Sequence, residues 1–336
     1  MRTRSLVACV LLLGLCNLGC SSDEPSGGDV VAPIDALAED GTDTWLDASA
    51  DGADVAEDPM QRIVRVTCEK MAECGAAALT IYTGDLEGCI AREYETMKLL
   101  PDLPGFVIDL KISADAVVSS SCAEFTRRSA LEVLPSGIQG TLPDGEPCVH
   151  PLQCASHVCA RLLGTSCGSC ASPLASGAAC DDSYLLGSPC GVGSTCVGGK
   201  CVALGDIGAA CDPASAPCFS DLGCVDGLCG LPKQAEQPCT LLAGECDLYS
   251  SGLACHPLLK KCTAFDFVGV GEQCGVTPTG GSVCTLGNCY PSLMNGTCMA
   301  QAADGDSCDT TVGPDCQFHA QCVNGKCEQF FAPVCR

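Results

Sequence analysis

Cysteine is the residue that most constrains this chain, because it occupies 33 of the 336 positions. A content near a tenth is typical of domains held together by disulfide bonds rather than by a large apolar core. Aromatic side chains, which dominate most cores, make up only 4% of the chain. Since disulfides persist in oxidising compartments, the sequence predicts an exported protein.

The N-terminus has the pattern of a signal peptide over residues 1–19. Arg2 and Arg4 form a positive region, and an apolar run from Leu6 to Leu15 follows them. A run of this length is too short to span a bilayer. We therefore expect removal of this segment and no transmembrane helix.

The next residues resemble the lipobox of bacterial lipoproteins. Leu18 and Gly19 precede Cys20, while Asn17 stands where that family normally has Leu. The resemblance implies cleavage before Cys20, a lipid on its thiol and attachment to a membrane. Ser21 implies the outer membrane. Cleavage would leave 31 cysteines, and acylation would leave 30 to pair. Ordinary secretion without a lipid is the alternative.

Residues 20–58 are predicted to form a disordered acidic tether. From residue 21 to residue 58 there are 12 Asp or Glu and no Lys or Arg, so this stretch cannot bury enough apolar surface to fold. The whole chain has a net charge of −24. Nucleic acid is not an expected partner, because phosphate binding requires a basic surface.

A small all-α domain with four cysteines is predicted over residues 59–136. Asp58 and Pro59 are typical of a helix N-cap and of the first helical position. The spacing of apolar residues predicts helices over about 60–74 and 85–100, and a third that begins after Ser113 and includes Phe125.

The disulfides of this domain follow from helix geometry. Cys68 and Cys74 are six residues apart, which places them about 9 Å apart along one helix and on different faces. They cannot easily bond to each other. We predict instead that Cys74 pairs with Cys89 and that Cys68 pairs with Cys122.

Residues 137–336 contain a repeated cysteine pattern. From Cys148 to Cys335 there are 26 cysteines in 188 residues, and six of them follow the related motifs GEPC, GAAC, GAAC, EQPC, GEQC and GDSC. The steps between these six are 32, 31, 28, 35 and 34 residues. This periodicity predicts an array of about six small disulfide-rich units built from β-hairpins and loops.

In three units the last two cysteines flank a glycine-containing turn, as at Asp226-Gly227 and Asn324-Gly325. Such dipeptides favour a two-residue type I′ hairpin, in which both cysteines face the same side. We favour pairing of the first cysteine with the third and the second with the fourth, although four cysteines allow three connectivities. The predicted bridges are Cys180–Cys196, Cys190–Cys201, Cys211–Cys224, Cys218–Cys229, Cys308–Cys322 and Cys316–Cys327.

Three features depart from this pattern. Cys262 follows LLKK without a glycine, Cys167 and Cys170 form a CxxC motif in the first unit, and Cys335 needs a partner outside the four-cysteine count. His150 and His157 lie near the CxxC motif, so a zinc site can be drawn there. A structural role for these cysteines is the favoured interpretation, because thiolates are needed for metal binding or redox chemistry.

The units resemble the cysteine-rich modules named after the Dickkopf N-terminal domain and, more loosely, EGF-like repeats. Cys308, Cys316, Cys322, Gly325 and Cys327 show the matching spacing. The order of lipoprotein signal, acidic linker, helical segment and cysteine-rich array resembles sets of bacterial surface lipoproteins. This resemblance implies a lipid-anchored protein at the outer membrane or cell surface.

The sequence contains no HExxH or phosphate-loop motif. We therefore expect no enzyme and no cofactor, but a binding or structural module for an unknown surface protein or glycan. One alternative is a thiol-redox or metal-binding protein that uses Cys167 and Cys170, and another is a secreted protease inhibitor. His256 and His319 are expected to be surface residues.

Overall fold

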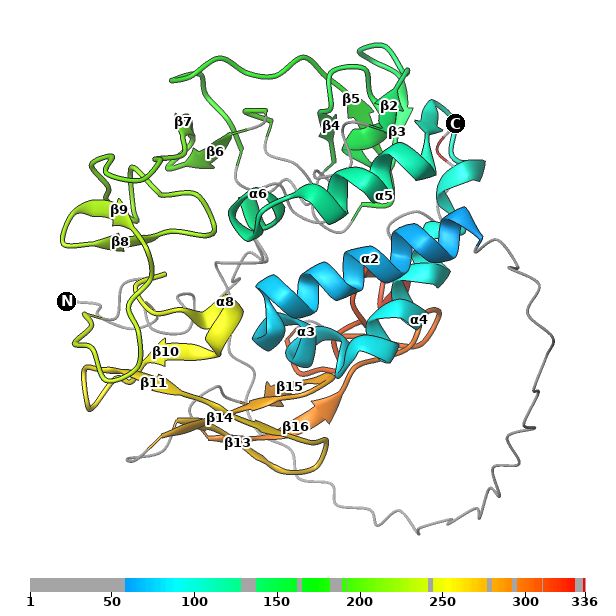
Figure 1. Cartoon of the computed structure of the whole chain (residues 1–336). Coiled ribbons are helices and arrows are strands. Elements are labelled where there is room, and N and C mark those ends of the chain that lie inside the picture. Colours follow the sequence, from blue (N-terminus) through cyan, green and yellow to red (C-terminus); the bar gives the residue numbers. More distant parts are fainter. Residues whose placement is uncertain are drawn as a thin grey trace, which may run out of the picture.

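A computed structural model describes residues 58–127, 137–161, 165–181, 189–191, 193–240, 244–276, 280–291, 295–309, 311–329 and 335. The predicted signal peptide, Cys20 and nearly all of the acidic tether lie outside these residues. A helical domain is followed by small strand-rich, disulfide-linked segments, which surround it (Figure 1). Among the described residues, no helix is both long and apolar enough to cross a membrane.

The helical domain begins where the sequence predicts. Asp58 caps the first helix by accepting a hydrogen bond from the backbone N–H of Met60 at 3.3 Å. The helices are α2 (Pro59–Cys74), α3 (Ala76–Thr83), α4 (Leu86–Met97), the 3-10 turn η1 (Leu100–Asp102), α5 (Leu110–Ser119) and α6 (Cys122–Arg127). The domain is not entirely helical, because β1 (Phe106–Ile108) pairs antiparallel with β2 (Ile138–Gly140).

Helix α2 is the centre of this domain and packs against both α4 and α5. One face of α2 is apolar, and Ile63 and Val64 on that face are each 1% exposed. Leu100, Val117 and Phe125 join them in a continuous core. This arrangement follows the ordinary rule that a helix buries its apolar stripe against its neighbours.

Helix α2 ends at Cys74 as predicted, but the sequence did not predict α3, which follows it directly. Gly75 ends α2 and begins α3, and a Cβ atom there would lie 2.2 Å from the ring of Tyr249, so the close packing requires glycine.

The predicted third helix, expected to begin after Ser113, is two helices, and the first of them already begins at Leu110, after its N-cap Asp109. Ser121 and Glu124 cap the second of them reciprocally, because the side chain of each accepts a hydrogen bond from the backbone N–H of the other.

Both disulfides predicted for the helical domain are wrong. The structure pairs Cys68 with Cys89 and Cys74 with Cys122, not Cys68 with Cys122 and Cys74 with Cys89. Helix α3 follows α2 and precedes α4 along the chain. It allows α4 to return along α2, so the first turn of α4, with Cys89, meets the middle of α2, with Cys68. The break before α6 then leaves Cys122 beside the end of α2.

The cysteine-rich array contains six units, called here repeats 1 to 6, over residues 148–170, 180–201, 211–229, 239–262, 274–298 and 308–327. Repeat 1 has three strands, β3 (Pro147–Cys148), β4 (Cys159–Ala160) and β5 (Gly168–Cys170), and the 3-10 turn η3 (Pro151–Gln153). Hairpins form repeats 2, 3 and 6: β6 (Ser194–Val197) with β7 (Lys200–Ala203), β8 (Gly223–Val225) with β9 (Leu228–Gly230), and β17 (Ala320–Val323) with β18 (Lys326–Gln329).

Repeats 4 and 5 are more elaborate. Repeat 4 contains the short helix α8 (Leu248–Ser251) and the pair β10 (Leu253–Cys255) and β11 (Cys262–Ala264). Repeat 5 contributes β13 (Gln273–Val276), β14 (Gly281–Cys284), β15 (Gly287–Tyr290) and β16 (Gly296–Ala300). With β12 (Asp266–Val268) these form a five-stranded sheet in the order β12-β14-β13-β16-β15.

The array surrounds the helical domain and is held by contacts along its length (Figure 1). In repeat 1, the Gln153 side chain donates to the carbonyl of Pro104 at 2.9 Å. Beside repeat 3, Arg127 forms ion pairs with Asp206 and Asp221. In repeat 5, the backbone N–H of Leu286 donates to the carbonyl of Ile81.

The strongest polar contacts join repeat 6 to α4. Arg92 forms a bidentate ion pair with Asp304, at 2.7 and 2.9 Å, and donates to the carbonyl of Phe318. Next to it, the imidazole Nε2 of His319 lies 2.7 Å from a carboxylate oxygen of Glu93, and both residues are buried. His319 is therefore an internal contact, and its predicted surface position is wrong.

Candidate interaction surface

The disulfide frame within the repeats follows one rule. The six bridges predicted for repeats 2, 3 and 6 are those that the structure contains: Cys180–Cys196, Cys190–Cys201, Cys211–Cys224, Cys218–Cys229, Cys308–Cys322 and Cys316–Cys327. Repeats 1, 4 and 5 show the same pairing of first with third and second with fourth cysteine.

Hairpin geometry explains this regularity. Cys224 lies directly opposite Cys229, and the turn residues Asp226 and Gly227 have φ values of 52° and 80°. These positive angles are those of a type I′ turn. Because the two cysteines project to the same side, each can reach a different cysteine from the preceding loops of the repeat.

The CxxC motif of repeat 1 is not a redox unit in this structure. Cys170 bonds to Cys154, and Cys167 bonds to Cys335, 168 residues away in sequence. The unassigned Cys335 therefore pairs with one half of the motif. A dithiol oxidoreductase needs its two motif cysteines to bond to each other, so this structure does not support that alternative.

The zinc alternative meets a related obstacle. The sulfurs of Cys148, Cys154 and Cys170 lie within 4.8 Å of one another, which is close enough for a shared metal ion. Each of them is in a disulfide, however, and a disulfide sulfur lacks the negative charge of the thiolate that binds zinc. The similar triplets in the other repeats are oxidised in the same way.

His150 has a structural position instead. Its Nδ1 accepts a hydrogen bond from the backbone N–H of Leu152, and the Gln153 side chain accepts the backbone N–H of His150, which forms a capping box for η3. His150 is 5% exposed. Burial, with the neighbouring His319 and Arg161, lowers the pKa of His150 to about 3, so the ring is neutral at ordinary pH.

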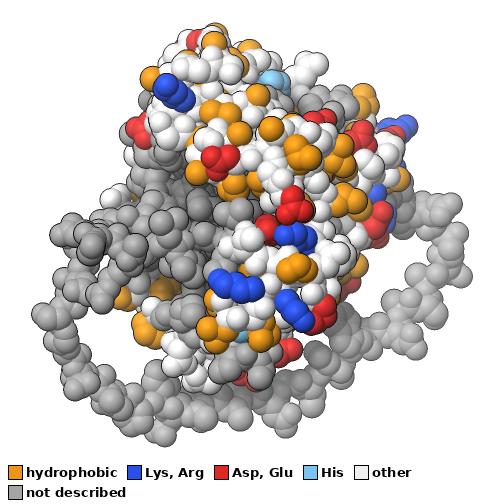
Figure 2. Space-filling model, turned by 90° about the vertical axis from the view of Figure 1, so that its left-hand side faces the viewer, with side chains coloured by type: hydrophobic (Ala, Val, Ile, Leu, Met, Phe, Trp, Pro, Cys, Tyr) orange, Lys and Arg blue, Asp and Glu red, His pale blue; other side chains and the backbone are white. Residues whose placement is uncertain are grey.

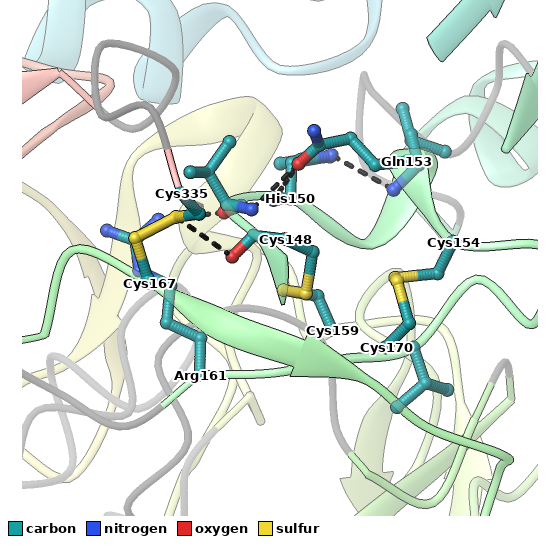
Figure 3. The surroundings of a disulfide bond; sticks show 12 residues. Cys148, His150, Gln153, Cys154, Cys159, Arg161, Cys167, Cys170 and Cys335 are labelled. Carbon is teal, nitrogen blue, oxygen red and sulfur yellow. Dashed lines mark hydrogen bonds between the residues drawn. A yellow bond between two sulfur atoms is a disulfide. The ribbon is translucent and has the colours of Figure 1, made fainter. Parts of the chain in front are cut away.

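Arg161 is a buried cation that the sequence did not reveal. Its guanidinium donates to the carbonyls of Thr165 and Val149, at 2.9 and 2.8 Å, and its side chain has no exposed surface. Desolvation lowers the pKa of Arg161 to about 10, which still leaves it charged at neutral pH. Figure 3 shows Arg161 and His150 around the Cys167–Cys335 bridge.

The hairpin tips are the parts of the repeats that vary. Repeats 2, 3 and 6 have two-residue tips between their paired strands, whereas the tip of repeat 4 extends from His256 to Lys261. Cys255 and Cys262 still lie directly opposite each other. The LLKK sequence therefore lengthens the loop and leaves the cysteine register unchanged.

A buried histidine fixes this longer tip. His256 is 2% exposed, and its Nδ1 accepts hydrogen bonds from the backbone N–H groups of Leu258 and Leu259, at 3.2 and 3.1 Å. Since Nδ1 accepts, Nε2 is the protonated nitrogen, and it lies 3.2 Å from the carbonyl of Gly280. His256 was expected at the surface, so that prediction is also wrong.

The fixed tip displays two apolar side chains to solvent. Leu258 is 70% exposed and Leu259 is 46% exposed. Lys260 follows them with φ of 53°, and Lys261 forms an exposed ion pair with Glu236 at 3.2 Å. Exposed apolar side chains are common on protein surfaces, but Leu258 and Leu259 are neighbours on a loop that His256 fixes, so we take the leucine tip (residues 258–261) as the candidate contact surface.

The face drawn in Figure 2 carries side chains of several kinds next to one another. Figure 2 shows hydrophobic side chains in several groups on one face of the molecule, with Lys and Arg side chains beside Asp and Glu. The leucine tip therefore stands out by its rigid support, not by the size of an apolar patch.

Comparison with known proteins gives one partial match. Over 72 residues the chain is 38% identical to colipase from the dog, Canis lupus familiaris, and the match covers 20% of this chain. The chain spans 64% of the length of that relative. No protein family matches the chain. No solved structure matches it either. The similarity supports an extracellular type of small cysteine-rich module.

Proposed function

We propose that this chain is an exported, lipid-anchored and non-catalytic binding protein. Its signal peptide would end before Cys20, the acyl chains on Cys20 would attach it to the outer membrane or cell surface, and the acidic tether would hold the array away from the lipid. The repeats would belong to the Dickkopf N-terminal-like or EGF-like class. The expected partner is a surface protein or glycan.

The leucine tip is the observation that best supports a binding role. Leu258 and Leu259 are exposed although a buried side chain, His256, fixes their backbone. A loop fixed before contact loses little conformational entropy on binding, which favours affinity. The oxidised frame adds rigidity, because all 30 cysteines among the described residues are in disulfides.

The anchor can be tested on its own. Replacement of Cys20 by Ala should abolish incorporation of a labelled fatty acid and move the protein from the membrane fraction to the soluble exported fraction. Cys16→Ala is the matched control, because Cys16 would leave with the signal peptide. Retention of Cys20→Ala in the membrane fraction would rule out the lipid anchor.

The binding role needs a separate test. Cross-linking on intact cells should join the wild-type protein to a defined partner, and Leu258→Ser with Leu259→Ser should lose that product. Val118→Ser is the control, because Val118 is 59% exposed on α5 and lies outside the array. Equal loss in the control, or an unchanged product in the double variant, would argue against the leucine tip.

A further inference from the structure

One disulfide differs from the other fourteen in what it connects. Among the described residues, 14 of the 15 bridges lie within a single repeat or within the helical domain, and they join cysteines 11 to 48 residues apart. Cys167–Cys335 spans 168 residues and joins repeat 1 to the chain beyond repeat 6. It therefore closes the array into a covalent ring around the helical domain.

One end of the closing bridge is an exposed residue. Cys167 is classed as exposed, whereas the other 29 bridged cysteines are buried or intermediate. Thiol–disulfide exchange requires a thiolate to reach a sulfur along the S–S axis, so access decides which bridge reacts first. Four-cysteine clusters such as that of repeat 1 are buried and shield one another.

Because Cys167 is the more exposed partner, attack at its sulfur makes Cys335 the leaving group. Its sulfur lies 3.6 Å from the carbonyl oxygen of Cys148 and 3.9 Å from that of Ser166. The next carbonyls along the same two segments, Val149 and Thr165, accept hydrogen bonds from Arg161. Carbonyl oxygens as close as those of Cys148 and Ser166 disfavour a thiolate on Cys335 and therefore favour re-formation of the bridge.

We propose that Cys167–Cys335 is a selectively reducible clasp, whose substrate is an external thiol or dithiol. The attacking thiolate bonds to Sγ of Cys167 and breaks the S–S bond, and Cys335 leaves as a thiolate. With a dithiol, the second reductant thiolate displaces Cys167, so the reductant becomes a disulfide and the chain gains two thiols. This inference goes beyond the proposed binding function and does not depend on the lipid anchor.

The clasp would be reversible because other contacts hold the ring together. The Ser166 hydroxyl donates to a carboxylate oxygen of Glu328 at 2.8 Å, and the Gln321 side chain donates to the carbonyl of Thr165. His319 and Glu93 also hold repeat 6 against α4. Repeat 6 therefore stays beside repeat 1 after reduction, and the two sulfurs remain available for reoxidation.

Partial reduction of the full wild-type chain tests the clasp. The folded protein is exposed to increasing dithiothreitol, its thiols are blocked by alkylation, and the blocked positions are mapped. We expect Cys167 and Cys335 to appear first, with a rate constant for reduction on the order of tenfold above that of the other bridges. Earlier reduction of another bridge, or loss of all bridges together, would overturn the proposal.

Two variants sharpen the assignment. Cys167→Ser with Cys335→Ser should abolish the first two-thiol step and leave fourteen bridges intact, and persistence of that step would contradict the clasp. Cys335→Ser alone should leave one thiol, at Cys167, that reacts rapidly with a disulfide reagent. An unreactive Cys167 in this folded variant would also count against it. Neither result alters the test of Cys20 acylation, so the two proposals can fail separately.

Discussion

The helical domain and the repeats have different kinds of core. In the helical domain, apolar side chains such as Ile63, Leu100 and Phe125 pack into one continuous cluster. In repeat 1, the buried cluster consists of the four cysteines Cys148, Cys154, Cys159 and Cys170, with Leu142 packed against them. The repeats therefore use disulfides where the helical domain uses apolar burial, as expected for units too small to bury much surface.

This contrast assigns different tasks to the two regions. The helical domain gains stability from the area it removes from water, and it presents a firm surface to the array. Each repeat gains stability from constraints on its unfolded chain, over loops that span 11 to 16 residues. The repeats can therefore change their loops, as repeat 4 does, without losing their frame.

The largest expected effect comes from the apolar core. Phe125→Ala should lower the free energy of unfolding of the helical domain by about 3–5 kcal/mol, because a large buried side chain leaves a cavity. Denaturant unfolding followed by the far-UV helical signal measures it. A loss below about 1 kcal/mol would show that disulfides, rather than packing, stabilise this domain too.

Removal of one disulfide from a repeat should cause a smaller and more local loss of stability. Cys274→Ala with Cys289→Ala should destabilise repeat 5 by about 2–4 kcal/mol, because it removes one of only two covalent links in that unit. Hydrogen exchange should rise in β13–β16 while α2 stays protected. Exchange that rises equally in α2 would show that the two regions unfold as one.

Acid should lower the stability of the part of repeat 1 that contains His150 and meets the helical domain. His150 has a pKa of about 3 when folded and 6.5 when unfolded, so only the unfolded chain takes up this proton between those values. Stability should fall by about 1.4 kcal/mol per pH unit as pH drops below 6.5, and show no such loss above it. His150→Asn keeps an N-cap acceptor and should remove this pH dependence of stability. His157→Asn, at an exposed position, is the control and should leave the pH dependence unchanged.

The smallest effect on folding is expected at the leucine tip. Leu258→Ser with Leu259→Ser should change the free energy of unfolding by about 0.5 kcal/mol or less, since exposed side chains contribute little. Thermal unfolding of the double variant and of Val118→Ser should give nearly equal midpoints. A large loss of stability would mean that the leucines pack against the molecule, and it would weaken their assignment to binding.

The sequence alone determined the parts of this fold that depend on local geometry. A glycine turn between two cysteines sets the hairpin register, so the pairing within repeats 2, 3 and 6 followed from spacing and turn chemistry. The start of α2 at Asp58 and Pro59 followed from capping rules in the same way.

Only the tertiary structure decided the contacts between distant segments. Cys68 could pair with Cys89 or Cys122 until α3 fixed where α4 lies, and Cys335 could be assigned to Cys167 only once the array had closed around the helices. Burial of Arg161, His256 and His319 depends on the same long-range packing. Sequence spacing constrains neighbours along the chain, whereas these pairs are set by how whole elements pack, which no local pattern encodes.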